Sequence, residues 1–213
     1  KQSIALDEAE LNRIEELIID NGDLNYYRHL FLLQCYTGLR FSDIIRMERY
    51  QDIDVTKTKI NLVTQKTNKT IPVPINNKSL PHLQYISDPT NYPFKLLSLK
   101  YKNTKPIQNA TYNRNIQKIC ELAKINTPMT QIKYTYNKEL RRKEGREEFV
   151  PKYKICSSHT ARRTFITMLI DKKVNPNLIM KITGHSTMKS FETYIRLSEI
   201  KAIDEVNNIF NEM

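Results

Sequence analysis

Signals that start and stop helices punctuate most of this chain, and they restrict it to a largely helical fold. Near the N-terminus, Asp7 followed by Glu10 forms a capping-box pattern. Apolar residues then recur at helical spacing, at Leu11, Ile14, Leu17 and Ile18. A second helix is expected over residues 24–36, because Gly38 supplies a stop signal. A short helix over residues 42–47 follows, with Arg40 just before it.

The C-terminal half carries the same kinds of signal. One helical face collects Tyr112, Ile116, Ile119, Cys120 and Ala123. Ser157 or Ser158 is expected to cap a helix that carries Arg162, Phe165, Met168 and Leu169. Asn175 and Pro176 begin another helix, which Gly184 ends. A further helix carries Phe191 and Tyr194, and residues 198–210 continue with an apolar stripe at Ile200, Ile203, Val206 and Phe210.

Two segments are predicted to be hairpins. Alternating apolar residues over 59–75 flank a polar turn at 67–69, and Pro72 and Pro74 restrict the second strand to a sheet edge. A second hairpin is predicted over 130–150, with its turn at 143–146. Residues 76–108 are dotted with prolines and give no clear assignment, although Phe94, Leu96 and Leu97 are candidate core residues. The expected fold class is α+β, mainly α-helical with a small antiparallel sheet.

Composition limits the function classes. The chain has 213 residues, a formal net charge of +11 and no internal repeat, so residues 1–213 are expected to form a single domain with a polyanionic partner. Nucleic acid is favoured, although charge alone leaves an anionic membrane surface or simple solubility open. Neither a membrane span nor a signal peptide is visible, and three widely spaced cysteines fit a reducing cytoplasm.

Six residues whose side chains can bind or react with a phosphate lie in short motifs along the chain. Arg40 lies within 37–43, Lys66 within 64–69, and His159 and Arg162 within 158–165. His185 lies within 183–186, and Tyr194 follows it on the next predicted helix. In this order, with these flanking residues, the set resembles the catalytic domain of tyrosine recombinases, or phage-type integrases, over about residues 6–194. The segments 160–165 and 184–189 look most like integrases of mobile elements in Bacteroidetes-type bacteria.

The resemblance implies a DNA breaking and rejoining fold and a covalent 3′-phosphotyrosine intermediate, with Tyr194 as the nucleophile. Two arginines can hold both non-bridging oxygens of one phosphate, a role that fits Arg40 and Arg162. Lys66 is the candidate acid for the departing oxygen, and Lys69 on the same turn is the alternative. Among the remaining residues, His159 or a basic neighbour can assist the tyrosine, His185 can hydrogen-bond the phosphate, and Asp43 can buttress the site. Lys69, Arg163 and Lys189 are expected DNA contacts.

Because cations supply the electrostatics, no cofactor or metal is required. The pair Cys156 and His159 has half of a zinc-site spacing, but no second pair follows nearby. Arg141, Arg142 and Arg146 on the second hairpin are either a solvated face or a contact to the DNA backbone. Two other functions stay open: a type IB topoisomerase, which uses a similar residue set, and a DNA-binding module without catalysis.

The family resemblance also predicts the assembly. Double-stranded DNA is the expected partner, bound by a homotetramer in which residues 198–213 pack on a neighbouring copy. DNA-bending accessory proteins are further expected partners, and a membrane is not. Members of the family usually carry an N-terminal DNA-binding domain, so the chain is expected to be the C-terminal part of a longer integrase. The expected location is the bacterial cytoplasm, in association with the nucleoid.

Overall fold

The structure is a computed structural model and describes residues 3–45, 59–91, 107–137 and 141–211. Within these ranges it is mainly helical, with two separate antiparallel sheets of two strands each, as the sequence predicts. The helices are α1 (Glu8–Glu15), α2 (Gly22–Thr37), α3 (Phe41–Ile44), α4 (Leu80–Ser87), α6 (Asn109–Leu122), α7 (Ser158–Asp171), α8 (Pro176–Thr183) and α9 (Met188–Asn211). The strands are β1 (Lys59–Val63), β2 (Thr70–Pro74), β3 (Pro128–Asn137) and β4 (Arg142–Pro151); short 3-10 turns η2 (Pro89–Asn91) and η3 (Lys152–Ile155) complete the elements.

Helix α2 is the centre of the core. It packs against α1, α4, α6 and α7, and buried residues therefore surround its axis rather than line one stripe. At its end, Gly38 adopts a left-handed conformation with φ of 67°. A Cβ atom at this position would lie 2.3 Å from Cδ1 of Phe165 on α7. Gly38 is thus required both by its backbone angle and by the close approach of α7.

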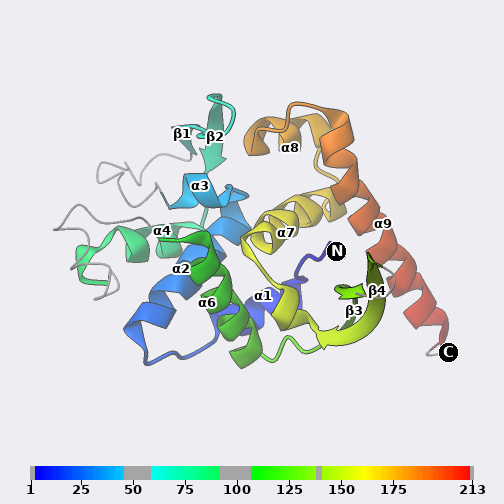
Figure 1. Cartoon of the computed structure of the whole chain (residues 1–213). Coiled ribbons are helices and arrows are strands. Elements are labelled where there is room, and N and C mark those ends of the chain that lie inside the picture. The colour runs from blue at the N-terminus through cyan, green and yellow to red at the C-terminus, as the bar shows by residue number, and fades with distance from the viewer. Residues whose placement is uncertain (1–2, 46–58, 92–106, 138–140, 212–213) are drawn as a thin grey trace.

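A second, smaller core joins α7, α8 and α9. Phe165, Ile166, Ile179 and Phe191 form it, and the ring of Phe191 is fully buried. The predicted starts and stops of these helices are confirmed: Ser157 caps α7, Asn175 caps α8 and Gly184 ends α8. Residues 188–211 form one continuous helix that runs along one side of the molecule to the C-terminus (Figure 1). This core holds the start of α9 against the rest of the domain.

The hairpin of β1 and β2 is confirmed, with Leu62 opposite Ile71 and Ile60 opposite Val73. The two-strand sheet leaves β2 at an edge, where Pro72 and Pro74 are tolerated. Helix α4 occupies part of the segment that the sequence left unassigned. Phe94, Leu96, Leu97 and the end of the predicted short helix at 46–47 lie outside the described residues.

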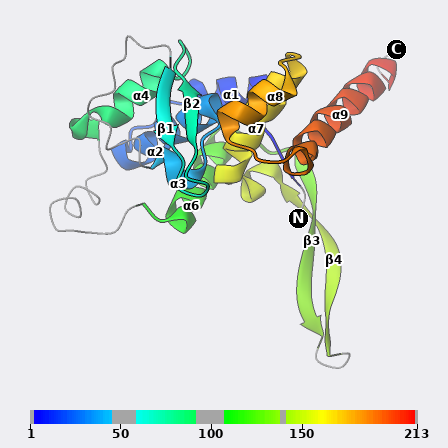
Figure 2. The same cartoon turned by 90° about the horizontal axis from the view of Figure 1, so that it is seen from above.

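The second predicted hairpin exists, but the predicted turn is wrong. Residues 143–146 lie within β4, and Tyr134 pairs with Gly145. A Cβ atom on Gly145 would approach Ile132 Cγ2 to 2.8 Å and Tyr134 Cε1 to 3.2 Å. The glycine therefore serves close packing within the sheet and not a turn. β3 and β4 form an arm that projects from the helical body (Figure 2).

No described helix is both long enough and apolar enough to form a membrane span.

Candidate functional site

Two arginines from distant segments meet where α2 and α8 end and α7 begins. Arg162 on α7 is only 3% exposed, and its guanidinium donates to the carbonyls of Gly38, at 2.8 Å, and Thr183, at 2.6 Å. Arg40 donates from Nη2 to the Gly184 carbonyl at 3.3 Å, and its buried Nη1 has no hydrogen-bond partner among the described residues. Burial, and then the charge of Arg40, lower the pKa of Arg162 to about 10. The pair thus offers concentrated positive charge with a buried donor still available.

Asp43 connects this pair to the first hairpin. Its side chain is fully buried, and Oδ1 accepts a hydrogen bond of 2.9 Å from the backbone N–H of Gln65. The hairpin tip is closed by a further bond of 2.9 Å from Thr64 N–H to the Lys69 carbonyl. Because Lys66 directly follows Gln65, Asp43 holds in place the backbone that presents Lys66.

Both candidate lysines lie at the rim of the cluster. Lys66 is exposed, and its charge acts on His159 and lowers the pKa of that histidine. Lys69 is also exposed, and its Nζ donates to Ser186 Oγ at 3.4 Å, one residue beyond His185. The hairpin therefore brings both lysines to the site, and the choice of Lys66 as acid stays a prediction.

His159 lies at the start of α7, with an exposed side chain. Its pKa is lowered, first by desolvation and then by four cations, Arg163, Arg162, Lys66 and Arg40. Partial burial also lowers the pKa of Arg163, and the charge of Tyr194 partly opposes that shift. The lowered pKa keeps His159 in its neutral form, which has a lone pair available to accept a proton.

His185 follows the end of α8 and forms two side-chain hydrogen bonds. Its Nδ1 lies 2.7 Å from Thr183 Oγ1, and its Nε2 lies 3.3 Å from Nη2 of Arg162. Burial lowers the pKa of His185 to about 3, and the charges of Arg162 and Arg40 add to this shift. His185 is therefore neutral at physiological pH.

Tyr194 on α9 packs onto this histidine within the same chain. The rings of Tyr194 and His185 meet edge to face, with centroids 5.3 Å apart, and Phe191 supports Tyr194 with a centroid distance of 5.8 Å. Tyr194 also acts on the Arg162 guanidinium, by charge when the phenol is ionised and by hydrogen bonding, and both raise the pKa of Arg162 against the effect of burial. Its side chain is half-buried, so the ring is held while an opening to the surface remains.

The structure thus brings Arg40, Arg162, His159, His185 and Tyr194 together, with Lys66 and Lys69 at the rim and Asp43 beneath. Lys189 is exposed on the first turn of α9. Arg141, Arg142 and Arg146 lie on the projecting arm. Sequence reasoning missed Thr183, which contacts both Arg162 and His185. The available signal was its place beside Gly184, but a threonine at a helix end has many ordinary explanations.

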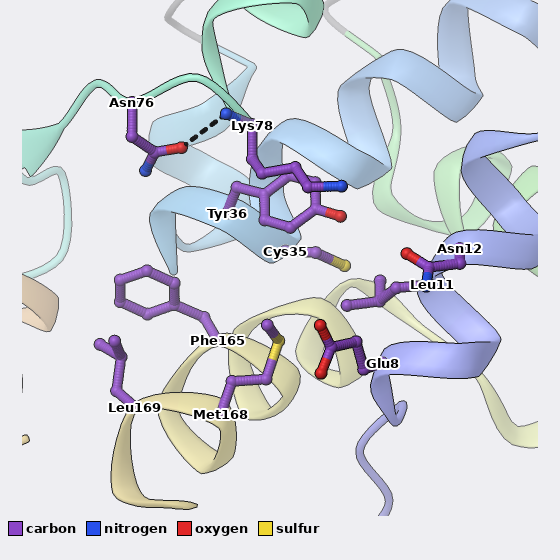
Figure 3. A pocket seen from close by; sticks show the side chains of 10 residues that line it. All are labelled: Glu8, Leu11, Asn12, Cys35, Tyr36, Asn76, Lys78, Phe165, Met168 and Leu169. Carbon is purple, nitrogen blue, oxygen red and sulfur yellow. Dashed lines mark hydrogen bonds between the residues drawn. The ribbon is translucent and has the colours of Figure 1, made fainter. Parts of the chain in front are cut away.

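A groove of about 290 Å³ between α1, α2 and α7 is a different feature (Figure 3). None of the six candidate residues lines it. Burial raises the pKa of the Cys35 thiol in its wall well above the usual value, so this thiol is not an activated nucleophile. The lining residues are Glu8, Leu11, Asn12, Cys35, Tyr36, Asn76, Lys78, Phe165, Met168 and Leu169. Because none of the six candidate residues lines this groove, chemistry on a phosphate is expected at the arginine cluster and not in the groove.

Within the described residues, no group of three or more histidine, cysteine or acidic side chains could hold a metal ion. The arginines, lysines and neutral histidines instead suit one tetrahedral anion held against a tyrosine. Fold and cluster together define a helical domain that presents a tyrosine beside an anion-binding site.

The chain belongs to the phage integrase family, whose model matches residues 5–200. A tyrosine recombinase of Pseudothermotoga lettingae is 24% identical over 205 residues, which cover 96% of this chain and 60% of the relative. The chain thus spans about 60% of the length of that relative.

Solved structures share the fold. XerA recombinase superposes with a TM-score of 0.61 at 17% identity, covering 99% of this chain and 66% of that one. XerH recombinase, bound to a palindromic difH substrate after cleavage, gives a TM-score of 0.59 at 15% identity, with 99% and 54% covered. The Tn1549 transposon integrase, in complex with a circular intermediate DNA, gives 0.56 at 16% identity, with 91% and 62% covered. The fold expected from the sequence resemblance is confirmed.

Proposed function

We propose that this chain is the catalytic domain of a site-specific recombinase that cuts and rejoins double-stranded DNA through a 3′-phosphotyrosine. One observation carries the proposal: Tyr194 packs against neutral His185 beside Arg162, where Arg40 has a buried donor that no residue in the described part of the chain satisfies. Structural relatives described in complex with DNA, XerH recombinase and the Tn1549 integrase, support DNA as the partner.

In the proposed reaction, the Tyr194 oxygen attacks the scissile phosphorus. The new bond joins phosphorus to the phenolic oxygen, and the bond from phosphorus to the 5′ oxygen of the DNA breaks. Arg40 and Arg162 bind the non-bridging oxygens and stabilise the charge of the pentavalent transition state. Rejoining is the same reaction in reverse, with the 5′ hydroxyl of a DNA strand as the nucleophile. The proposed reaction uses no cofactor.

Two proton transfers complete the reaction. The phenol proton passes to a neutral base, and the lowered pKa values of His159 and His185 keep both residues available for this role. The departing 5′ oxygen takes a proton from Lys66 in this proposal, with Lys69 as the alternative. Asp43 contributes by holding the hairpin that carries both lysines.

The assembly proposed for this chain is a tetramer on DNA. The C-terminal half of α9 exposes apolar side chains, with Ile203 59% and Phe210 69% exposed, which supports packing of residues 198–211 on a neighbouring copy. Lys69, Arg163 and Lys189 would contact the DNA backbone around the site. An N-terminal DNA-binding domain, DNA-bending partners, a bacterial nucleoid location and an origin in a Bacteroidetes-type mobile element also remain proposals.

The test compares the original chain with Tyr194→Phe on supercoiled plasmid and on a nicked duplex. A denaturing gel should show a covalent protein–DNA adduct that is absent from the variant, and mass spectrometry should place the DNA on the peptide containing Tyr194. Tyr134→Phe is the matched control, because Tyr134 is 65% exposed on the projecting arm. DNA binding should be nearly equal in all three proteins.

The same experiment separates the alternative functions. A topoisomerase would relax the plasmid but fail to exchange strands between two duplexes that carry the recombination site. A binding module would retain DNA affinity and form no adduct, even as the full-length integrase on its own site. Adduct formation that survives Tyr194→Phe would show that another residue is the nucleophile.

A further inference from the structure

Thr183, the last residue of α8, contacts two of the proposed functional side chains at once. The residue is fully buried. Its carbonyl accepts from Arg162 Nη2 at 2.6 Å, and its hydroxyl lies 2.7 Å from His185 Nδ1. The same hydroxyl donates to the Ile179 carbonyl at 2.6 Å. Thr183 thereby joins the second arginine of the site to the second histidine.

The donors and acceptors in this chain of contacts allow one arrangement of protons. A guanidinium has only donors, so His185 Nε2 must accept the hydrogen bond from Arg162, which lies at 3.3 Å. A neutral imidazole then carries its proton on Nδ1 and donates it to Thr183 Oγ1. The Thr183 hydroxyl has its own proton directed at the Ile179 carbonyl, which leaves its lone pairs free for His185. Turning the imidazole over would lose both side-chain contacts.

We propose that Thr183 is a positioning residue that fixes the orientation and the tautomer of His185 for DNA cleavage. The proposal rests on the proposed function of the site. With Nδ1–H held by Thr183, the Nε2 lone pair faces Arg162 beside the Tyr194 ring. When a bound phosphate takes over the Arg162 donor, the Nε2 lone pair becomes free for the Tyr194 proton, and the imidazolium keeps its place because Nδ1 still donates to Thr183. This is the usual role of a group that orients a catalytic base.

The first test needs no DNA and examines the tautomer directly. The chain has four histidines, so nitrogen-15 labelling of histidine gives a small set of imidazole signals, and the signals lost in His185→Asn identify that residue. His185 should show a protonated Nδ1 and an unprotonated Nε2. Thr183→Val has a similar shape but cannot accept, so the signature of a hydrogen-bonded Nδ1–H should be lost. Thr183→Ser should retain it, and unchanged signals from His29 and His82 would show that the variants are folded.

The second test measures the rate of adduct formation on a nicked duplex at saturating DNA. Thr183→Val should slow the reaction by roughly tenfold to a hundredfold, because the base is no longer held in place. DNA affinity should be unchanged, and Thr183→Ser should react at close to the original rate. A Val variant with the original rate and tautomer overturns the proposal, and so does a Ser variant as slow as Val. If neither the original chain nor the full-length integrase on its own site forms an adduct, the proposed function fails, while the nitrogen-15 signals still decide whether Thr183 sets the tautomer.

Discussion

Two regions of this molecule hold a histidine between an arginine and a second acceptor, yet only one has the features of a reaction site. In the cluster of α2 and α4, Arg28 Nη2 lies 3.1 Å from His29 Nε2, and His29 Nδ1 lies 3.0 Å from His82 Nδ1. His29 therefore donates to His82, just as His185 donates to Thr183 in the proposed site. The hydrogen-bond pattern of a histidine alone does not distinguish structure from function.

The two regions differ in their balance of positive and negative charge and in how far other side chains cover the histidine. In the cluster of α2 and α4, Glu15 accepts from Lys78 at 2.8 Å and from Tyr36 at 2.5 Å, and the Tyr85 ring stacks on His29 at 3.7 Å. In the proposed site, Asp43 is the acid that acts on Arg162, whereas the cations gathered there are Arg40, Arg162, Arg163, Lys66 and Lys69. Within the described ranges Arg28 also has a nitrogen without a partner, Nε, so an unpaired donor is not sufficient evidence either. An excess of positive charge beside an accessible tyrosine identifies the site.

The largest effect is expected at the hairpin lysines, which are part of that excess. Lys66→Ala should slow cleavage by about 10²–10⁴-fold, because the leaving oxygen loses its acid. Lys69→Ala should have a much smaller effect. A substrate with sulfur in place of the 5′ bridging oxygen should restore cleavage by Lys66→Ala, since a thiolate leaves without a proton.

The sulfur substrate also decides between the two lysines. Rescue of Lys69→Ala in place of Lys66→Ala would assign the acid to Lys69. An absence of rescue for both variants would show that the lysines bind DNA and do not transfer the proton.

A matched pair of arginine substitutions tests the comparison next. Arg162→Lys should lower the rate of adduct formation by about 10²–10³-fold, because one point donor replaces two directed ones. Arg28 donates to the Glu15 and Leu17 carbonyls, at 2.8 Å and 2.7 Å, and so closes the end of α1. Arg28→Lys should therefore cost about 1–3 kcal/mol of unfolding free energy and leave the rate at saturating DNA unchanged. Rates and urea unfolding of both variants provide the measurement, and equal losses of rate would break the comparison.

Local signals made much of this fold predictable. The capping box of Asp7 and Glu10 is present, and both left-handed glycines end helices where the sequence places a stop. The prolines of residues 76–108 suggest irregular chain and so hide helix α4, although Pro81 lies in its first turn, where a missing N–H costs nothing. The sequence pattern predicts a turn at Gly145, whereas the glycine makes room for Ile132 and Tyr134.

The sequence predicts which residues form the site, but not the hydrogen bonds that join them across separate elements. The motifs identify Arg40, Arg162, His185 and Tyr194, and the structure brings them together, while their catalytic roles remain predictions. The bond from Gln65 to Asp43 and the bond from Arg162 to the Thr183 carbonyl join separate elements, so no local pattern reports them. Placement of Tyr194 in the site of its own chain likewise depends on how α9 packs against α7.

The smallest effect concerns the pH dependence of stability in the cluster of α2 and α4. Burial lowers the pKa of His29 to about 3 and that of His82 to about 4, although the charge of Glu15 partly opposes the shift of His82. As pH falls, the unfolded chain therefore binds protons at a higher pH than the folded chain does. The stabilisation that comes from keeping both histidines neutral is complete above about pH 6.5 and is lost progressively toward pH 4. A loss on the order of 2 kcal/mol between pH 7 and pH 4.5 is expected, measured by urea unfolding.

The control for this prediction is His82→Asn, whose amide oxygen can still accept from His29 but cannot be protonated. His185 also titrates with a lowered pKa, so the original chain must be compared with the variant at each pH. The slope of unfolding free energy against pH should be smaller in His82→Asn, while the rate of adduct formation at pH 7 should not change. An unchanged slope would mean that His82 is not held neutral by its surroundings. A changed rate would mean that the two histidine regions are coupled, and the distinction between a structural cluster and a reaction site would fail.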